Sequence, residues 1–281
     1  MKVGIVGKGF VGSAVYEGLG YVDNEMAFYD PKYPESKFSD VLDCGCIFVC
    51  VPTNPLPNGE CDVSIVESTL DKLAEENYKG LVAIKSTVVP GTTDKLKDKY
   101  PQIRLAFVPE FLRERSALSD FIDNHDVLIV GTYNEEDAKV LIDLHGNIPK
   151  SVSKMTPLEA ELAKYFNNVY NTLRIVFANG FYEVCQKVGA SYNAIFSAMI
   201  KRDNITPHYL RCSQSLRGAS GPCLSKDPIA FMKYVANLEL ENPPQIFKTI
   251  VEDNALYPQT VIEGTREESE VFGKNITKEK F

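Results

Sequence analysis

The chain has 281 residues, of which 44% are hydrophobic, and 38 acidic against 30 basic residues give it a formal net charge of −8. This length and composition suit one large or two ordinary folded domains. Nucleic acid is excluded as an expected partner, because no dense basic cluster is available to bind phosphates. No apolar run approaches the roughly 18 to 20 residues of a membrane span, and no signal-peptide pattern is visible. We therefore expect a cytoplasmic protein without membrane contact.

The chain contains seven cysteines. Their odd number, and the position of Cys46, Cys50 and Cys185 within apolar runs, indicate reduced thiols. Cys44, Cys46 and Cys50 lack a second group at the spacing of zinc ligands, so no metal site is expected.

Residues 1–152 are expected to form an α/β domain of the Rossmann type. Short, continuous apolar runs alternate there with helical patterns, as expected for strands that are covered on both faces. The predicted strands are 2–6, 26–29, 46–51, 81–85, 104–108 and 127–131. Helices are predicted at 63–76 and 135–145, with Asp62 and Asn134 as their N-caps. This alternation is typical of a doubly wound parallel sheet.

Residues 153–262 are expected to form an all-helical central domain, because strand patterns stop after about Ser153. Apolar residues at helical spacing predict a helix over 156–189, which would be on the order of 50 Å long. Such a helix usually packs against a second surface, so a homodimer through it is expected; the alternative is a break near Gly180. Shorter helices follow, and the charged segment 263–281 is expected to be a flexible tail.

A glycine-rich segment follows the first predicted strand and opens a helix. It consists of Gly7, Lys8, Gly9, Phe10, Val11 and Gly12. The glycines permit a tight turn and close approach of the backbone to a pyrophosphate, whose charge the helix N-terminus attracts. Asp30 ends the second strand, where its carboxylate would bind the ribose of NAD and repel the 2′-phosphate of NADP. The segment therefore predicts NAD as the cofactor, with Lys32 as the one argument for NADP.

Five further segments extend this pattern over nearly the whole chain. They are 51–53, 85–91, 109–114, 161–168 and 221–227. In their order and spacing they resemble the UDP-glucose/GDP-mannose dehydrogenase family. The resemblance implies a nucleotide-sugar substrate and a role in polysaccharide biosynthesis. The reaction that it implies is oxidation of UDP-glucose to UDP-glucuronate, through a cysteine thiohemiacetal and thioester.

The residues in these segments suit that chemistry. Lys164 and Asn168 stand four apart on the predicted long helix, so an ammonium and an amide share one face and could stabilise an oxyanion. Cys223 is expected to begin a helix, where the dipole and Lys226 favour a thiolate that can capture an aldehyde. Asp227 is expected one turn later on the same side.

The resemblance also implies individual roles. The catalytic residues would be Cys223 as nucleophile, Lys164 and Asn168 as oxyanion stabilisers, Asp227 and Thr87 as holders of a water molecule, and Glu114 as an acid or base. The cofactor would contact Gly7, Gly9, Phe10, Val11, Gly12, Asp30, Thr53, Thr87, Glu114 and Lys226. The sugar nucleotide would contact Glu110, Phe111, Leu112, Arg113, Lys164, Asn168, Tyr209 and Ser220.

The chain departs from the family pattern at several points. Family members usually carry a third, C-terminal domain that binds the nucleotide, which is expected to be lacking here. Ser220 stands in the loop where the family has glycine, Ser225 replaces a proline, and Asn204 stands near the position of a sugar-binding arginine. Two other functions remain open: a two-domain hydroxyacid dehydrogenase that needs no cysteine, and a catalytically silent homologue that binds NAD.

Overall fold

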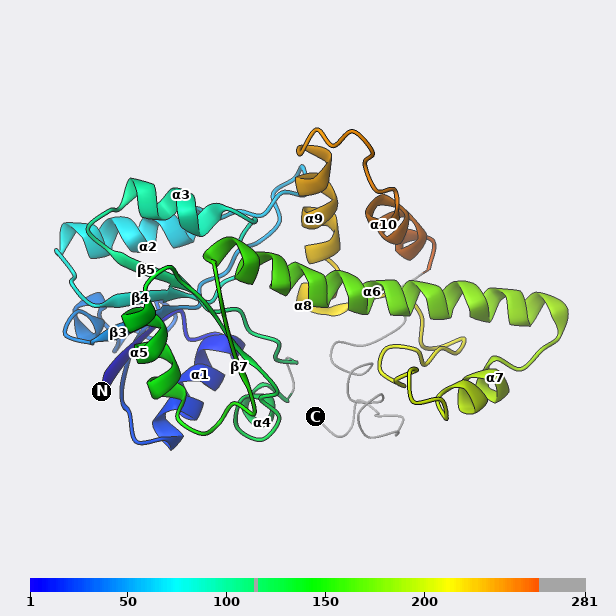
Figure 1. The fold of residues 1–281 in the computed structure, drawn as a ribbon, viewed down its shortest axis with the longest axis horizontal. Helices are drawn as coiled ribbons and strands as arrows, with labels where there is room; N and C mark the ends of the chain where they lie inside the picture. Colours follow the sequence, from blue (N-terminus) through cyan, green and yellow to red (C-terminus); the bar gives the residue numbers. More distant parts are fainter. Residues whose placement is uncertain (114–115, 258–281) are drawn as a thin grey trace. The chain divides into compact units, whose positions relative to one another are not determined.

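The computed structural model describes residues 1–113 and 116–257. It divides the chain into two compact units, Met1–Lys164 and Tyr165–Phe281. The first unit is an α/β structure, and the described part of the second is helical (Figure 1). The predicted order, an α/β fold followed by a helical part, is thus confirmed. The expected tail over 263–281 lies outside the described residues.

A seven-stranded sheet forms the centre of the first unit. Its strands are β1 (Lys2–Val6), β2 (Glu25–Tyr29), β3 (Cys46–Val49), β4 (Leu81–Ile84), β5 (Arg104–Phe107), β6 (Leu128–Gly131) and β7 (Val152–Met155). Their order is β2-β1-β3-β4-β5-β6-β7. The strands from β2 to β5 are parallel. Their carboxyl ends therefore meet at one edge, and the chain changes direction of winding at β1, where such sheets bind ligands.

Helices cover both faces of this sheet. They are α1 (Phe10–Tyr21), η1 (Phe38–Val41), α2 (Ser64–Glu75), α3 (Thr92–Lys99), α4 (Ala117–Ile122) and α5 (Glu135–His145). Figure 1 shows α2 and α3 on one face and α1, α4 and α5 on the other. Each strand contributes to both cores by alternation, so Phe48 packs under α1 and α5 while Val49 packs under α2.

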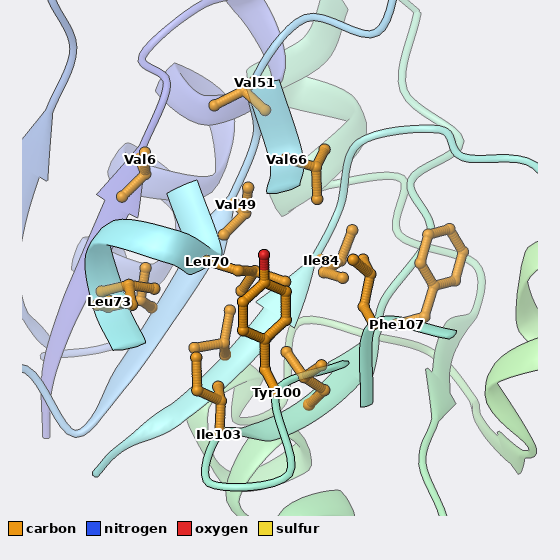
Figure 2. Packing of buried hydrophobic residues seen from close by; sticks show 14 of the residues in the cluster. Val6, Val49, Val51, Val66, Leu70, Leu73, Ile84, Tyr100, Ile103 and Phe107 are labelled. Atoms are coloured by element: carbon orange, nitrogen blue, oxygen red, sulfur yellow. The ribbon is translucent and has the colours of Figure 1, made fainter. Parts of the chain in front are cut away.

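The core on the α2 side is closely packed, as Figure 2 shows. Leu70 of α2 lies with Val49, Ile84 and Phe107 from three neighbouring strands, and all four are fully buried. Burial of each such side chain contributes roughly 1.5–3 kcal/mol. The continuous apolar runs noted in the sequence are therefore strands enclosed between two helical layers.

Two features of the sheet differ from the prediction. The first is β7, which no sequence pattern indicated, because this strand follows β6 at the end of the strand order and leaves alternate residues such as Val152 exposed. The second is the direction of β6. It runs antiparallel to β5, with one register pair between Phe107 and Gly131, so the sheet is parallel only in part.

Most predicted element bounds agree with the structure within two residues. Asn134 is the N-cap of α5, since its side chain accepts hydrogen bonds from the backbone N–H groups of Glu136 and Asp137. The expected N-cap of α2, Asp62, lies one residue too early, because Val63 holds that position. Its carboxylate nevertheless accepts the backbone N–H of Ser64, the first helical residue, at 2.9 Å.

The described part of the second unit is built on helices. They are α6 (Pro157–Val188), which begins in the first unit, α7 (Tyr192–Met199), α8 (Gly221–Leu224), α9 (Asp227–Ala236) and α10 (Ile246–Leu256). The predicted long helix is confirmed, and α6 continues for 32 residues without a break at Gly180. Small apolar clusters hold its partners, such as Val176 with Ile250 of α10.

Two histidines lie inside the first unit near α4 and α5. The His145 ring is fully buried, and its Nδ1 lies 2.7 Å from the carbonyl oxygen of Leu141. The ring of His125 lies 5.9 Å from it, between centroids. Burial lowers the pKa of His145 to about 3 and that of His125 to about 4, with Lys85 adding to both shifts. Both histidines are therefore neutral in the folded protein at neutral pH.

This burial predicts acid sensitivity of the first unit. In the unfolded chain these histidines take up protons near pH 6.5. Their contribution to the free energy of unfolding is therefore complete above that pH, and it is lost as the pH falls toward the lower pKa values of the folded state. Each histidine contributes a slope of about 1.4 kcal/mol per pH unit. Denaturation of the His145→Phe variant between pH 7 and 4.5 should show a shallower slope than the native chain. Leu56→Phe provides the control, because Leu56 is exposed and carries no titratable group, so this variant should keep the native slope.

Candidate active site

The glycine-rich turn lies between β1 and α1, at the carboxyl end of the sheet. Gly7 has a φ of +90°, and a side chain there would meet the carbonyl oxygen of Cys50 at 2.8 Å. A Cβ at Gly12 would lie 1.9 Å from the carbonyl oxygen of Gly7. Gly9 differs, because a Cβ there would meet nothing within 4 Å. Gly7 and Gly12 thus serve internal packing, while Gly9 faces open space.

The start of α1 fits the pyrophosphate of a dinucleotide. The helix begins at Phe10, followed by Val11, and its N-cap Gly9 makes no side-chain hydrogen bond. The first N–H groups of a helix lack partners within the helix, and they attract anions. The open position of Gly9 lets the backbone approach such a group closely. These residues therefore fit NAD.

Asp30 follows β2 and is fixed beside this turn. Its Oδ2 accepts the backbone N–H of Lys8 at 2.7 Å, and its Oδ1 accepts that of Lys32 at 2.8 Å. The side chain is only 8% exposed. A carboxylate oxygen can accept more than one hydrogen bond, so the ribose hydroxyls of a dinucleotide still find acceptors here.

The loops after β3 and β4 carry two of the predicted residues, Thr53 and Thr87, and both are buried. The thiol of Cys61 links them, because its Sγ lies 3.3 Å from the carbonyl oxygen of Thr87 and 4.0 Å from that of Thr53. The Ser86 hydroxyl donates to the carbonyl of Val51 at 2.7 Å. The sequence did not identify Cys61 or Ser86, whose roles depend on contacts between distant loops.

Lys164 forms a buried ion pair in the first unit. Its Nζ lies 2.8 Å from Oε1 of Glu110 and 2.6 Å from the carbonyl oxygen of the same residue. Both side chains are at least 94% buried. The second carboxylate oxygen of Glu110 accepts the backbone N–H of Leu112, and the Phe111 ring centre lies 5.8 Å from the ammonium. The predicted residues Glu110, Phe111, Leu112 and Lys164 thus come together.

A second buried lysine near this pair was not predicted as part of the site. Lys85 directly follows β4, and its Nζ donates to the carbonyl of Val108 at 3.3 Å. Burial lowers its pKa to about 8, while Cys50 and Glu110 oppose that shift and Lys164 adds to it. A lysine at the end of an apolar strand was the one sequence signal for this position.

Glu161 ties the start of α6 to α3. The fully buried carboxylate accepts hydrogen bonds from the backbone N–H groups of Gly91 and Thr93 and from the Thr93 hydroxyl. Burial raises the pKa of Glu161, and these hydrogen bonds act against that rise. Glu161 stands one turn before Lys164 on α6. Its contacts with Gly91 and Thr93 therefore hold this turn of the helix in place, and with it the position of Lys164. The sequence placed Glu161 in a family segment but assigned it no role.

Two predicted residues of the first unit remain, Arg113 and Glu114, and the structure describes only the first. Both the backbone N–H and the Nε of Arg113 donate to Oδ2 of Asp120, each at 2.9 Å. Asp120 is buried, so this pair holds the start of α4 in place. Glu114, the predicted acid or base, lies outside the described residues.

In the second unit, a polar chain joins α6 to α9. Asn168 is 4% exposed, and its Nδ2 donates to Oδ2 of Asp227 at 2.6 Å. The other carboxylate oxygen of Asp227 accepts a hydrogen bond from the Lys226 ammonium at 2.6 Å. Asp227 is 1% exposed, so the two donors compensate the burial of its charge.

Cys223 lies on the short helix α8 and is half-buried. The next residue, Leu224, is buried, and its carbonyl lies 3.4 Å from the Thr172 hydroxyl. The Ser225 hydroxyl donates to the carbonyl of Gly221 at 2.7 Å. The prediction that Cys223 and Asp227 share one helix was wrong, because α8 ends at Leu224 and α9 begins at Asp227. Residues 225 and 226 thus form a turn between the helix of Cys223 and the helix of Asp227.

Two further predicted sugar contacts of this unit, Tyr209 and Ser220, lie in its loops. Tyr209 has a φ of +62°, which is uncommon for a residue with a side chain. The guanidinium of Arg174 lies 5.0 Å from its ring centre and 4.7 Å from that of Tyr170. Ser220 precedes α8 and is half-buried. The sequence analysis missed Arg174, whose stacking depends on the fold of the loop.

The contrast between two glycines gives a test of the dinucleotide site. Gly12→Ala should destabilise the first unit by about 1–3 kcal/mol, because the added Cβ collides with the turn. Gly9→Ala meets no atom of the chain and should keep the native melting temperature, but should weaken NAD binding. Thermal denaturation and titration with NADH measure the two effects. Equal losses of stability in both variants would contradict this assignment.

Within residues 1–113 and 116–257, no group of three or more His, Cys, Asp or Glu side chains is arranged to hold a metal ion. No helix in the same part of the chain combines the length and apolarity that a membrane span requires. The polar groups described above are therefore the candidates for chemistry in this structure.

Comparison with protein families identifies two matching domains. Residues 34–149 match the NAD-binding domain of the UDP-glucose/GDP-mannose dehydrogenase family, and residues 158–255 match its central domain. The two matches together span most of the chain. The glycine-rich turn and Asp30 precede the first match, so their assignment rests on the geometry given above.

Similar proteins carry consistent names. A UDP-glucose 6-dehydrogenase of Rickettsia felis is 26% identical over 98% of this chain and 70% of its own length. A UDP-glucose dehydrogenase structure from Pyrobaculum islandicum superposes with a TM-score of 0.80 at 26% identity, covering 91% of this chain and 68% of that one. A 3-hydroxyisobutyrate dehydrogenase of Mycobacterium tuberculosis has a TM-score of 0.67 over 91% of this chain and 92% of its own, but at 14% identity it shares only the fold.

Proposed function

Because the chain belongs to the UDP-glucose/GDP-mannose dehydrogenase family, whose NAD-binding and central domains it contains, we propose that it is a nucleotide-sugar 6-dehydrogenase. In this reaction the C6 alcohol of the sugar is oxidised to a carboxylate. The observation that carries the proposal is the half-buried thiol of Cys223 on α8, whose last residue, Leu224, accepts the Thr172 hydroxyl. A dehydrogenase that removes a single hydride from an alcohol has no use for a nucleophilic cysteine.

The proposed chemistry uses this thiol between two oxidations. NAD, when bound, accepts one hydride in each oxidation. The first oxidation converts the alcohol to an aldehyde, and the Cys223 sulfur then bonds to the aldehyde carbon to give a thiohemiacetal. Loss of the second hydride gives a thioester. Water adds to the thioester carbon and the carbon–sulfur bond breaks, which releases the carboxylate and restores the thiol.

The other proposed catalytic residues act on oxygen atoms and protons. The Lys164 ammonium, whose charge Glu110 balances, is proposed to stabilise an oxyanion together with the Asn168 amide. Asp227 and Thr87 are proposed to hold the attacking water. The hydrogen bond from Asn168 to Asp227 supports joint action of these two residues, because each fixes the orientation of the other.

The proposed substrate is UDP-glucose, with UDP-glucuronate as the product. This choice rests on the names of similar proteins, such as the Rickettsia felis and Pyrobaculum islandicum dehydrogenases. A GDP-mannose 6-dehydrogenase of Pseudomonas aeruginosa is 25% identical over 72% of this chain. GDP-mannose is therefore the comparison substrate in the test.

The stoichiometry of NADH release tests the proposal. The native chain should release two NADH per sugar consumed from one member of a panel of UDP- and GDP-hexoses. Cys223→Ser should release at most one NADH per sugar, because the first oxidation does not use the thiol and a serine hydroxyl cannot form the thioester that the second oxidation produces. Cys212→Ser is the control, since Cys212 is a half-buried thiol of the same unit with no proposed role. This control should keep the native stoichiometry.

The other outcomes favour the two alternatives. One NADH per substrate, unchanged in Cys223→Ser, would indicate a hydroxyacid dehydrogenase, whose fold this chain shares. Tight NADH binding without oxidation of any hexose would indicate a catalytically silent homologue.

We also propose that the chain forms a homodimer through α6. Large apolar side chains follow one stripe of this helix at spacings of four, seven, four, three and four residues. They are Phe166, Tyr170, Phe177, Phe181, Val184 and Val188, and each is at least 42% exposed. Such a stripe is typical of a helix that packs against another helix. A second copy presents the same stripe, which makes a two-fold contact self-complementary.

The dimer can be tested by placing a charge in this stripe. Phe177 is 59% exposed, so Phe177→Glu should not disturb the fold of the subunit. Sedimentation equilibrium should show the native chain at twice the mass of this variant. Lys187→Glu, near the end of the same helix but outside the stripe, should remain dimeric. A native chain that sediments as a monomer at micromolar concentration would contradict the proposal.

A further inference from the structure

The side chain of Lys8, within the glycine-rich turn, lies among three aromatic rings. Its Nζ lies 3.8 Å from the ring centre of Phe28, 4.0 Å from that of Tyr16 and 5.9 Å from that of Tyr33. The rings pack edge to face, with 5.7 Å between the centres of Tyr16 and Phe28. Aromatic faces attract cations, most strongly at such short distances. We call these three residues the aromatic cage.

The cage directs the ammonium away from a nearby carboxylate. The backbone N–H of Lys8 donates to Asp30 at 2.7 Å, so the base of the lysine side chain lies beside this carboxylate. The hydrogen bonds that this carboxylate accepts come from neutral backbone N–H groups, those of Lys8 and Lys32. Among residues 1–113 and 116–257, the carboxylates that form ion pairs do so with lysines and arginines other than Lys8. The ammonium instead lies on the aromatic faces.

We propose that the aromatic cage is a determinant of cofactor specificity, which keeps the ribose pocket selective for NAD over NADP by holding the Lys8 ammonium away from Asp30. The negative charge of Asp30 repels a 2′-phosphate and accepts hydrogen bonds from a 2′-hydroxyl. A lysine side chain is long enough to turn from the cage toward its neighbour. Released there, it would neutralise Asp30 and offer a cation to the phosphate.

The cage also explains why a basic residue is compatible with this position. Lysine next to the ribose would by itself favour the phosphorylated cofactor, since a phosphate gains a charge-assisted hydrogen bond from it. The same is true of Lys32, but its side chain is exposed and lies in water, where its effect is screened. Specificity for NAD therefore depends on where the Lys8 side chain is held and not only on the presence of Asp30.

A double-mutant cycle between the cage and the lysine tests this inference. The variants are Phe28→Leu, Lys8→Met and the combination of both, in the full chain. Leucine keeps an apolar side chain at position 28 but removes the aromatic face. The dissociation constants of NADH and NADPH are measured by the fluorescence of the bound nucleotide. Phe38→Leu is the matched control, because Phe38 has a lysine at 5.6 Å, Lys72, and lies on another part of the unit.

The measured quantity is the preference for NADH, which is the dissociation constant of NADPH divided by that of NADH. Phe28→Leu should lower this preference roughly tenfold, as expected from the loss of a close cation–π contact. The double variant should regain the native preference, because the released cation is gone. Phe38→Leu should leave it unchanged.

Two results would overturn the inference. Equal weakening of both nucleotides in Phe28→Leu would mean that the ring has only a packing role. A lower preference that persists in the double variant would mean that Lys8 is not the responsible cation. The inference rests on cofactor binding by the first unit and not on the sugar chemistry. A failure of the Cys223 experiment therefore leaves this one interpretable, and the reverse also holds.

Discussion

The ion pair between Lys164 and Glu110 is the interaction on which the catalytic interpretation of the first unit depends. A buried ammonium without a partner costs several kcal/mol, and the Glu110 carboxylate offsets that cost for Lys164. Its second contact, with the Glu110 carbonyl, fixes the backbone after β5 as well. The same contact thus shapes the loop that begins at Glu110.

The contacts of Glu161 help to hold Lys164 in its position beside Glu110. This carboxylate closes the start of α3 and lies one helical turn before Lys164. Movement of α6 along its axis would therefore break hydrogen bonds to Gly91 and Thr93 as well as the ion pair. Buried polar groups with every hydrogen bond satisfied are stiff in this way, because no partial rearrangement satisfies them again. The second unit uses a similar arrangement around Asp227, which Asn168 and Lys226 hold within the helices.

The accuracy of the sequence predictions follows from how local each signal was. Asn134 was identified as a cap because its partners are two and three residues away. The strands from β1 to β5 were found because they are apolar on both faces. β7 was missed because it lies at the sheet edge, where one face is polar. The role of Glu161 was missed because its partners stand 68 and 70 residues earlier in the chain.

The sequence by itself determined the strands from β1 to β6, the long helix α6, the glycine turn with its acidic partner, and the family. Each of these depends on side-chain type and on spacing within a short segment. Only the tertiary structure decided which charges neutralise one another, that α8 ends before Asp227, and that the Lys8 ammonium lies on aromatic rings. These outcomes depend on distances of a few ångströms between segments that are remote in the chain, and spacing along the chain does not specify such distances.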